Sequence, residues 1–287
     1  MSEAAEAAPT RADCVADSAG GLTFHISDWP RPEPGSYDDW NGALVLRLRG
    51  AGPPAADDEV RLPLGPTADG RLQAALPGTV ALPEGRWDVF VAYGDQEPER
   101  LAPGLRDLRS LVDRRPGPST SPLSVRIPYA TKHDNLSLRT WRRVPHAEAG
   151  EIRLEDGAMA VSGRLYRVES PGDWLAGAVV EARCRRDKTL VRTAPVTADG
   201  AGFSFTLPYA RLAENWGGGA DLWNLWLRPA DGTAAPVRLA RILDDVADKK
   251  EIFTYPVRTV DAPHGTATVR PYYTVDNDLS VKVADPD

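Results

Sequence analysis

The sequence of 287 residues contains only two cysteines and four histidines. Neither cysteine belongs to a C-x-x-C pair, and no histidine lies at a zinc-ligand spacing from a cysteine or another histidine. Nowhere do the roughly eighteen consecutive apolar residues of a transmembrane helix occur. We therefore expect no bound metal, no disulfide bond and no membrane insertion.

The common catalytic and nucleotide-binding motifs are also absent from the sequence. It contains no G-x-S-x-G motif, no phosphate-binding loop of the G-x-x-x-x-G-K type and no dinucleotide-binding glycine motif at the start of a helix. We interpret the glycines at 217–219 as a flexible loop. No cofactor is expected, and no linear motif indicates a reaction.

No part of the chain has a large excess of basic residues, and the net charge is −7. A protein that binds the nucleic-acid backbone needs a surplus of Lys and Arg, so nucleic acid is not an expected partner. One local basic cluster follows a predicted strand, and it consists of Arg183, Arg185, Arg186 and Lys188. We interpret this cluster as the solvated end of a hairpin in preference to an anion-binding site.

The first residues are acidic and lack the apolar segment of a secretory signal peptide. We predict that residues 1–20 form a disordered acidic tail that includes Cys14. Cys184 lies in an alternating apolar run, which predicts a small buried side chain. Together these observations predict a cytoplasmic protein with two reduced cysteines.

What the sequence does contain is an internal repeat. Residues 128–139 align with residues 271–282 and share Pro, Tyr, Thr, Leu and Ser in register. Three upstream pairs keep the same order: Asp39-Trp40 with Asp173-Trp174, Asp69-Gly70 with Asp199-Gly200, and Trp87–Val91 with Trp223–Leu227. A repeat of about 130 residues has the size of an independent domain. The sequence therefore predicts a tandem duplication, with domains at 21–141 and 157–287 and a short linker at 142–156.

Abundant Gly and Pro and several alternating apolar windows favour strands and turns. The predicted strands are Leu44–Arg49, Ala178–Cys184, Trp87–Tyr93, Trp223–Leu227, Leu22–Ile26, Glu59–Leu64, Phe203–Leu207, Ser124–Ile127, Thr266–Arg270 and Leu279–Val283. The windows Leu105–Val112 and Val237–Val246 fit equally well a short helix or a strand that runs into a turn. Many short strands in domains of this size predict an all-β fold of two tandem β-sandwich domains of the immunoglobulin-like type.

The densest carboxylate pattern is the Asp-Asn-Asp run at residues 276–278. Such a run could bind calcium, but the further ligands of an EF-hand loop are missing. The first repeat has His133 where the second has Asp276, and this exchange would weaken a calcium site. We interpret the shared feature as a turn with the same backbone geometry in both repeats.

The chain has eight Trp but only five Phe. Trp40, Trp87, Trp174 and Trp223 each have a counterpart in the other repeat, and we predict that these four are packing residues. Three tryptophans beside turns have no counterpart. Because sugars stack on exposed indole rings, we predict ligand binding by Trp29, Trp141 and Trp216, together with Asn215.

The closing pattern of the chain consists of residues 244–250, Phe253–Pro256, Arg270–Thr274 and Asn277–Val281. It resembles the β-sandwich accessory domains that follow the catalytic domains of actinobacterial cell-wall glycosyltransferases and glycerophosphotransferases of the teichoic-acid type. The resemblance covers both repeats, roughly residues 21–283, and implies a scaffold or glycan-binding role. No nucleotide-sugar motif can be carried over, so the resemblance implies no transferase activity.

We predict a non-enzymatic binding or scaffold protein that recognises a cell-envelope glycan or docks on a polymer-synthesising enzyme. One alternative is a small enzyme that acts on a sugar or natural-product intermediate through Asp38, Asp39 or Asp173. Another is a structural homo-oligomer that associates through exposed edge strands. A pocket that gathers unmatched polar residues from one repeat only would favour the enzyme, whereas symmetric surfaces would favour the scaffold.

Overall fold

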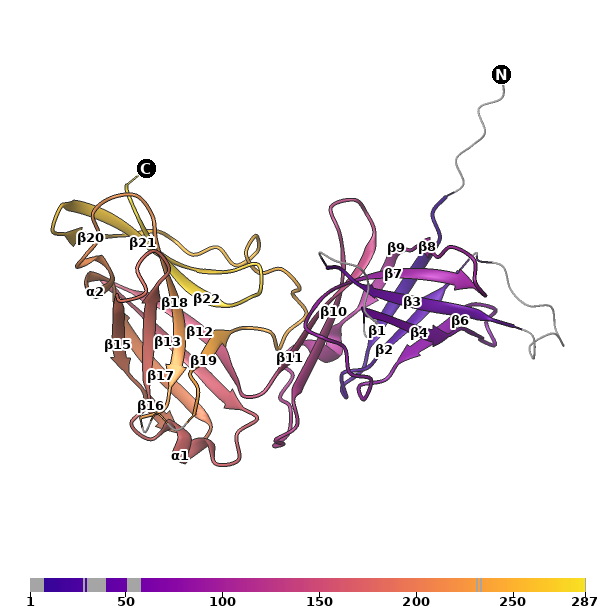
Figure 1. Ribbon diagram of the computed structural model, residues 1–287, viewed down its shortest axis with the longest axis horizontal. Helices are drawn as coiled ribbons and strands as arrows, with labels where there is room; N and C mark the ends of the chain where they lie inside the picture. Colours follow the sequence, from indigo (N-terminus) through magenta and orange to yellow (C-terminus); the bar gives the residue numbers. More distant parts are fainter. Residues whose placement is uncertain are drawn as a thin grey trace, which may run out of the picture. The chain divides into compact units, whose positions relative to one another are not determined.

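The computed structural model describes residues 8–27, 29, 40–50, 58–230, 232 and 234–286. These residues fold mostly into β-strands with a few short helices, which confirms the all-β fold (Figure 1). None of the helices among them is long and apolar enough to cross a membrane. The chain divides into two compact units, namely Met1–Arg115 with Ser124–Arg142 and Leu243–Ala247, and Pro116–Leu123 with Arg143–Ile242 and Asp248–Asp287.

The strands of the first unit form two sheets. One sheet has the order β5 (Gly65–Pro66), β6 (Leu72–Leu76), β2 (Leu22–Ile26), β1 (Arg11–Ala16), β9 (Ala102–Asp107). The other has the order β10 (Leu123–Ala130), β11 (Leu136–Arg143), β7 (Gly85–Tyr93), β3 (Gly42–Leu48), β4 (Glu59–Pro63), with β8 (Glu99–Arg100) beside β7.

The second unit has one continuous set of paired strands. Its main path is β16 (Thr197–Asp199), β17 (Gly202–Pro208), β13 (Ala158–Tyr166), β12 (His146–Glu155), β19 (Val237–Ala240), β18 (Asp221–Arg228), β22 (Leu279–Ala284), β21 (Gly265–Tyr273), β20 (Arg258–Ala262). Strand β14 (Val179–Cys184) joins β18 to β15 (Val191–Pro195). Two short helices, α1 (Pro171–Leu175) and α2 (Tyr209–Ala213), lie between strands in the sequence.

The two units repeat the same strand order. In each, a first strand pairs antiparallel with the second strand and parallel with a later one, β9 in the first unit and β19 in the second. The register repeats as well, because Ser137 lies opposite Asp88 in the first unit and Ser280 lies opposite Asn224 in the second. The internal repeat of the sequence is therefore present in the pairing of the strands.

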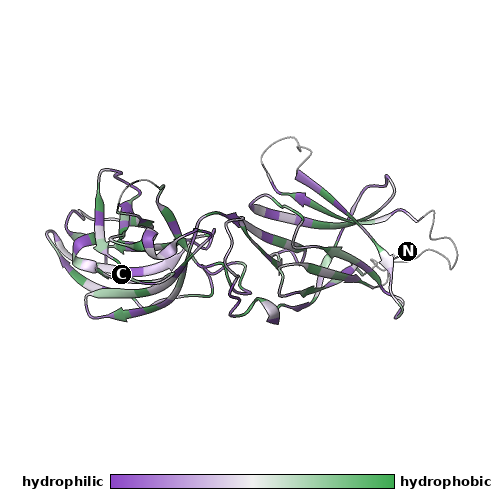
Figure 2. Cartoon of the chain, turned by 90° about the horizontal axis from the view of Figure 1, so that it is seen from below, coloured by the Kyte–Doolittle hydropathy of each residue, from purple (hydrophilic) through white to green (hydrophobic). Residues whose placement is uncertain are grey.

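One face of the strands is buried and the other is more exposed. Along β18, buried and half-buried residues alternate, as the two-residue period of a strand requires. Figure 2 shows the same alternation of hydrophobic and hydrophilic residues in both units. Trp87 and Trp223 occupy the buried faces of β7 and β18, which confirms their prediction as packing residues. The predicted strands all overlap observed ones.

The prediction of a disordered tail is wrong for the segment 11–16, which forms strand β1. Ala12, Cys14 and Ala16 alternate along this strand and are buried. Small side chains give a weak hydrophobic pattern, and the flanking charges obscured it. Residues 1–7 lie outside the described residues.

The predicted linker 142–156 is also wrong for most of its length, because strand β12 occupies His146–Glu155. This strand pairs with β13 and β19, and Ala147 and Ala149 are buried. The register shifts between Ala149 and Ile152, and this irregularity interrupts the alternation. A bulged strand of small residues looks like a linker in the sequence.

The two ambiguous windows are strands that run into turns. Strand β9 covers Ala102–Asp107 and a single 3-10 turn follows at Arg109–Leu111. Strand β19 covers Val237–Ala240, and no helix follows it up to residue 246.

Both cysteines are buried free thiols. Burial raises the pKa of Cys14 to about 12, so the reactive thiolate is scarce near neutral pH. We expect Ellman's reagent at about pH 8 to label neither cysteine in the native protein and to label both after denaturation in urea. Rapid labelling of one thiol in the native protein would contradict the burial of that side chain.

Candidate functional site

Two of the predicted ligand-binding tryptophans are buried. Trp141 is 1% exposed and Trp216 is 4% exposed, so the expectation that they present an indole face to solvent is wrong. The guanidinium of Arg139 lies 4.9 Å from the Trp141 ring centroid. The indole N–H of Trp216 donates to the carbonyl of Gly219 at 3.1 Å. A tryptophan beside a turn can cover the end of a core as readily as it can face solvent.

The other two predicted residues lie in different surroundings. Trp29 is half-buried and packs edge-to-face on Trp40, with ring centroids 5.9 Å apart. Asn215 is exposed, and its side-chain oxygen accepts a hydrogen bond from Arg192. Trp29 and Trp141 belong to the first unit, whereas Asn215 and Trp216 belong to the second. The structure thus does not gather the predicted residues into one site.

Of the three carboxylates of the enzyme alternative, only Asp173 lies within the described residues. Asp173 is exposed in the first turn of α1, and Asp38 and Asp39 lie outside the described residues. Within the described part of the chain, no three His, Cys, Asp or Glu side chains come together as metal ligands.

The carboxylate run 276–278 forms a turn that both repeats share. The amide of Thr274 donates to the carbonyl of Asp278 at 2.9 Å, and Thr131 and Asn135 make the same bond in the first repeat. Asn277 and Asp134 both have a positive φ angle at the same place in this turn. The interpretation of this run as a turn is confirmed.

The second unit contains a groove of about 660 Å³. Its floor is the less buried face of β18, β21 and β22, which contributes Leu222, Tyr272 and Lys282. The segment 250–255 forms a further wall. A volume of this size falls within the usual range of small-ligand pockets.

The groove is rich in positive charge. Its walls carry Arg185, Lys250, Arg270 and Lys282, against a single acid, Glu251. The Lys250 ammonium lies 3.9 Å from Glu251. Among the described residues, no acidic side chain forms an ion pair with Arg185, Arg270 or Lys282.

Aromatic rings form the apolar part of the groove. Phe253, Tyr255 and Tyr272 line it. The rings of Phe253 and Tyr255 also pack on the buried Tyr273, at centroid distances of 5.8 and 6.4 Å, and burial raises the pKa of Tyr255. The hydroxyl of Tyr272 is buried and has no hydrogen-bond partner within the described residues. A buried hydroxyl without a partner is destabilising by about 1–3 kcal/mol unless a ligand or water bonds to it.

A polar cluster on the same face of the sheet borders the groove. The amide oxygen of Asn224 accepts hydrogen bonds from Arg185 at 2.8 Å and from Arg238 at 3.0 Å. Arg238 also donates to Ser280 at 2.7 Å. The guanidinium groups of Arg183 and Arg238 lie 5.1 and 5.5 Å from the ring centroid of Trp226.

The first unit contains the same cluster in the same register. Arg100 donates to Asp88 at 2.8 Å and to Ser137 at 3.1 Å, and Arg49 also donates to Asp88. Arg47 and Arg100 lie 5.2 and 4.9 Å from the ring centroid of Phe90. The acceptor at the centre of the cluster differs between the units. It is the carboxylate of Asp88 in the first unit and the amide of Asn224 in the second.

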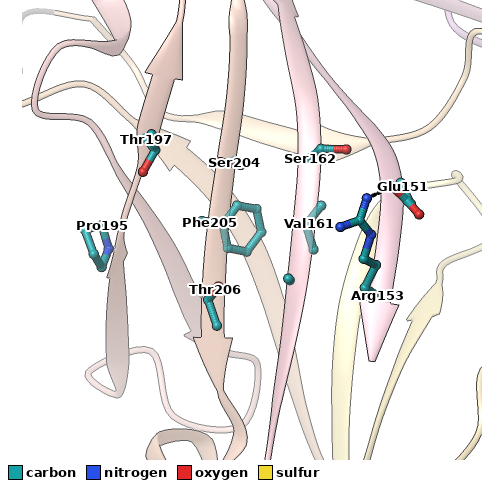
Figure 3. Close-up of a pocket in the computed structure, with 10 residues that line it drawn as sticks. Glu151, Arg153, Val161, Ser162, Pro195, Thr197, Ser204, Phe205 and Thr206 are labelled. Carbon is teal, nitrogen blue, oxygen red and sulfur yellow. Dashed lines mark hydrogen bonds and ion pairs between the residues drawn. The ribbon is translucent and has the colours of Figure 1, made fainter. Parts of the chain in front are cut away.

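A second, smaller hollow of about 360 Å³ lies over β12, β13, β16 and β17 (Figure 3). Thr197, Ser204 and Ser162 are neighbours in register across three of these strands. Glu151 and Arg153 pair with each other at 2.7 Å, and the only aromatic residue of the lining, Phe205, is buried in the core. With its charges paired and its ring buried, this hollow offers a ligand fewer contacts than the groove.

The sequence patterns include several residues that line the groove, but none of these residues is predicted from the sequence to bind a ligand. Tyr272 lies in the repeated block, and residues 250–255 adjoin or belong to the closing pattern, but neither was selected as a binding residue. Arg185 was in the basic cluster that was interpreted as a solvated hairpin end. Two members of that cluster, Arg183 and Arg186, pair with the acids Glu181 and Asp221 within the described part of the chain.

Comparisons with known proteins give a distant structural likeness. No protein-family model matches the chain, and no curated protein matches it in sequence. Among solved structures, S. aureus TarS 217-571 is similar with a TM-score of 0.29 and 14% identity, over 69% of this chain and 55% of that one. A second S. aureus TarS structure has the same TM-score and identity, over 68% of this chain and 35% of that one. The chain thus spans about half of the first structure, and the similarity is too weak to place it in a family.

Proposed function

We propose that this protein is a binding protein without catalytic activity of its own, and that the groove of its second unit binds a glycan. The observation that supports this most is the combination of three aromatic rings, Phe253, Tyr255 and Tyr272, with four basic side chains in one groove of about 660 Å³. No equivalent set of rings lines the smaller hollow.

The chemistry of the groove suits a sugar ring. Aromatic faces pack against the apolar C–H faces of a ring, and polar groups at their edges bond to its hydroxyls. Tyr272 offers both, since its ring lines the groove and its hydroxyl lacks a partner.

The proposal also covers the binding partner and the cellular location. The partner would be a glycan of the cell envelope, or a polymer-synthesising enzyme of the cell envelope on which the protein docks, in keeping with the sequence resemblance to accessory domains of teichoic-acid-type enzymes. Two free thiols that are buried and unpaired are typical of a reducing compartment, which supports a cytoplasmic location.

Replacing Tyr272 by alanine should weaken glycan binding about tenfold or more, because the variant loses both the ring face and the hydroxyl. The measurement is isothermal titration calorimetry of the purified protein against a panel of neutral and charged glycans, with unfolding curves to verify the fold.

Tyr129→Ala is the matched control, because Tyr129 occupies the aligned position in the first unit. It should leave the affinity unchanged. Equal affinities for Tyr272→Ala and the unchanged protein, or no binding of any glycan, would contradict the proposed function.

A further inference from the structure

The duplicated polar cluster differs between the units in its charge. In the first unit, the Asp88 carboxylate bonds to both Arg49 and Arg100. Burial of Asp88 acts to raise its pKa, but the hydrogen bonds and charges of the two arginines outweigh this effect and lower it. Asp88 is therefore ionised near neutral pH, and the first cluster neutralises part of its own charge.

In the second unit, Asn224 makes the corresponding hydrogen bonds without a charge. Arg238 still has an acid nearby, because Asp278 lies at 3.5 Å, but Asp278 also pairs with Arg143 at 3.0 Å. Burial and the neighbouring Arg185 and Arg143 lower the pKa of Arg238 to about 10, against the opposing effect of Asp278. The second cluster thus has more cationic than anionic groups.

Arg185 links this cluster to the groove. Its Nε atom donates to Asn224 at 2.8 Å, while the residue also lines the groove with Arg270 and Lys282. Strand pairing places Arg270 directly opposite Lys282. The amide of Asn224 holds the Arg185 side chain in place and leaves its positive charge uncompensated.

We propose that the groove selects an anionic ligand, one whose ring bears an oxyanion of the sulfate or phosphate type, and that Asn224 is the positioning residue that makes this selection possible. The inference rests on the proposed function for the groove as the binding site. Guanidinium groups bind such oxyanions through paired hydrogen bonds, and unpaired cations in a partly enclosed groove attract them strongly. An aspartate at this position would engage Arg185 and Arg238 as Asp88 engages Arg49 and Arg100.

The test is therefore Asn224→Asp, a nearly isosteric change that introduces the residue of the first unit. We expect binding of dextran sulfate to weaken about tenfold or more at low salt, because the new carboxylate competes for Arg185 and repels the ligand. Asn224→Ala is the matched variant, since it removes the amide that holds Arg185 but adds no charge, and it should weaken binding clearly less than Asn224→Asp does. Neutral dextran of the same length separates the charge requirement from the sugar requirement.

The outcomes separate the inference from the proposed function. Equal binding of dextran sulfate by the unchanged protein and Asn224→Asp, or equal losses in Asn224→Asp and Asn224→Ala, would overturn the inference alone. If inorganic sulfate binds as well as dextran sulfate and with the same dependence on Asn224, the anion site stands and the glycan proposal fails. No binding of either sulfate probe by the unchanged protein would overturn the inference. Unfolding curves of both variants establish that each is folded.

Discussion

Replacing Trp223 with alanine is expected to lower the free energy of unfolding by about 3–5 kcal/mol, the usual cost of truncating a large buried ring. Trp223 is 1% exposed and lies opposite Cys184 on β14 and Val281 on β22. Its removal would open a cavity where three strands meet in the core. The loss is measured by urea denaturation followed by far-UV circular dichroism.

Trp226→Ala is the control on the same strand. Trp226 lies on the opposite, half-buried face, where its contacts are with two arginines. Cation–π contacts contribute about 0.5–1 kcal/mol at exposed sites and about 2 kcal/mol where the cation is desolvated, as Arg238 is, so the loss should be smaller than for Trp223. Equal losses in the two variants would show that Trp223 is not the packing centre of this sheet.

Much of the fold could be predicted because the chain repeats itself. The Trp-containing strand and the Pro-Tyr block each occur twice, and this repetition indicated which segments form the strands of the core. Alternating apolar residues indicated which face of each strand is buried. Strands β1 and β12 escaped detection because their buried residues are mostly small, alanine and cysteine in β1 and alanine in β12, and the register shift in β12 further weakens its alternation. The pairing of these strands with distant ones, β9 and β19, decided their structure.

The candidate site could be predicted only in part. Tryptophans beside turns were selected for exposure, but the exposure of a ring depends on which distant residues cover it, and Trp141 and Trp216 are covered. The exchange of Asp88 for Asn224 is visible in the aligned sequences. The effect of this exchange on the local charge depends on Arg100 and Arg238, which bond to Asp88 and Asn224. Sequence spacing does not reveal these contacts.

Replacing Arg126 with methionine is expected to destabilise the first unit by about 3–5 kcal/mol, because the change leaves buried acceptors without a donor. Arg126 is 2% exposed, and its guanidinium donates to the carbonyls of Pro77 at 2.7 Å, Gly78 at 3.4 Å and Val80. Burial lowers the pKa of Arg126, and the neighbouring Arg114 acts in the same direction. The side chain nevertheless stays charged near neutral pH, since an arginine pKa is far above 7.

Arg109→Met is the control for the loss of an arginine. The Arg109 side chain is 90% exposed and pairs with Asp107 on the surface, where such pairs contribute little. Urea denaturation should show a large loss for Arg126→Met and almost none for Arg109→Met. Hydrogen exchange should accelerate in residues 77–80 for the first variant only.

The second unit supplies the sharpest version of this test. In the aligned repeats, Val269 occupies the position of Arg126 and is fully buried. The fold therefore accepts an apolar side chain at this point when no loop carbonyls need a donor. Arg126→Val introduces the residue of the second unit into the first, and we expect it to be as destabilising as Arg126→Met, because the carbonyls of residues 77–80 remain unpaired. Unchanged stability in Arg126→Val would mean that these carbonyls find water instead, and that the arginine contributes nothing to holding the loop.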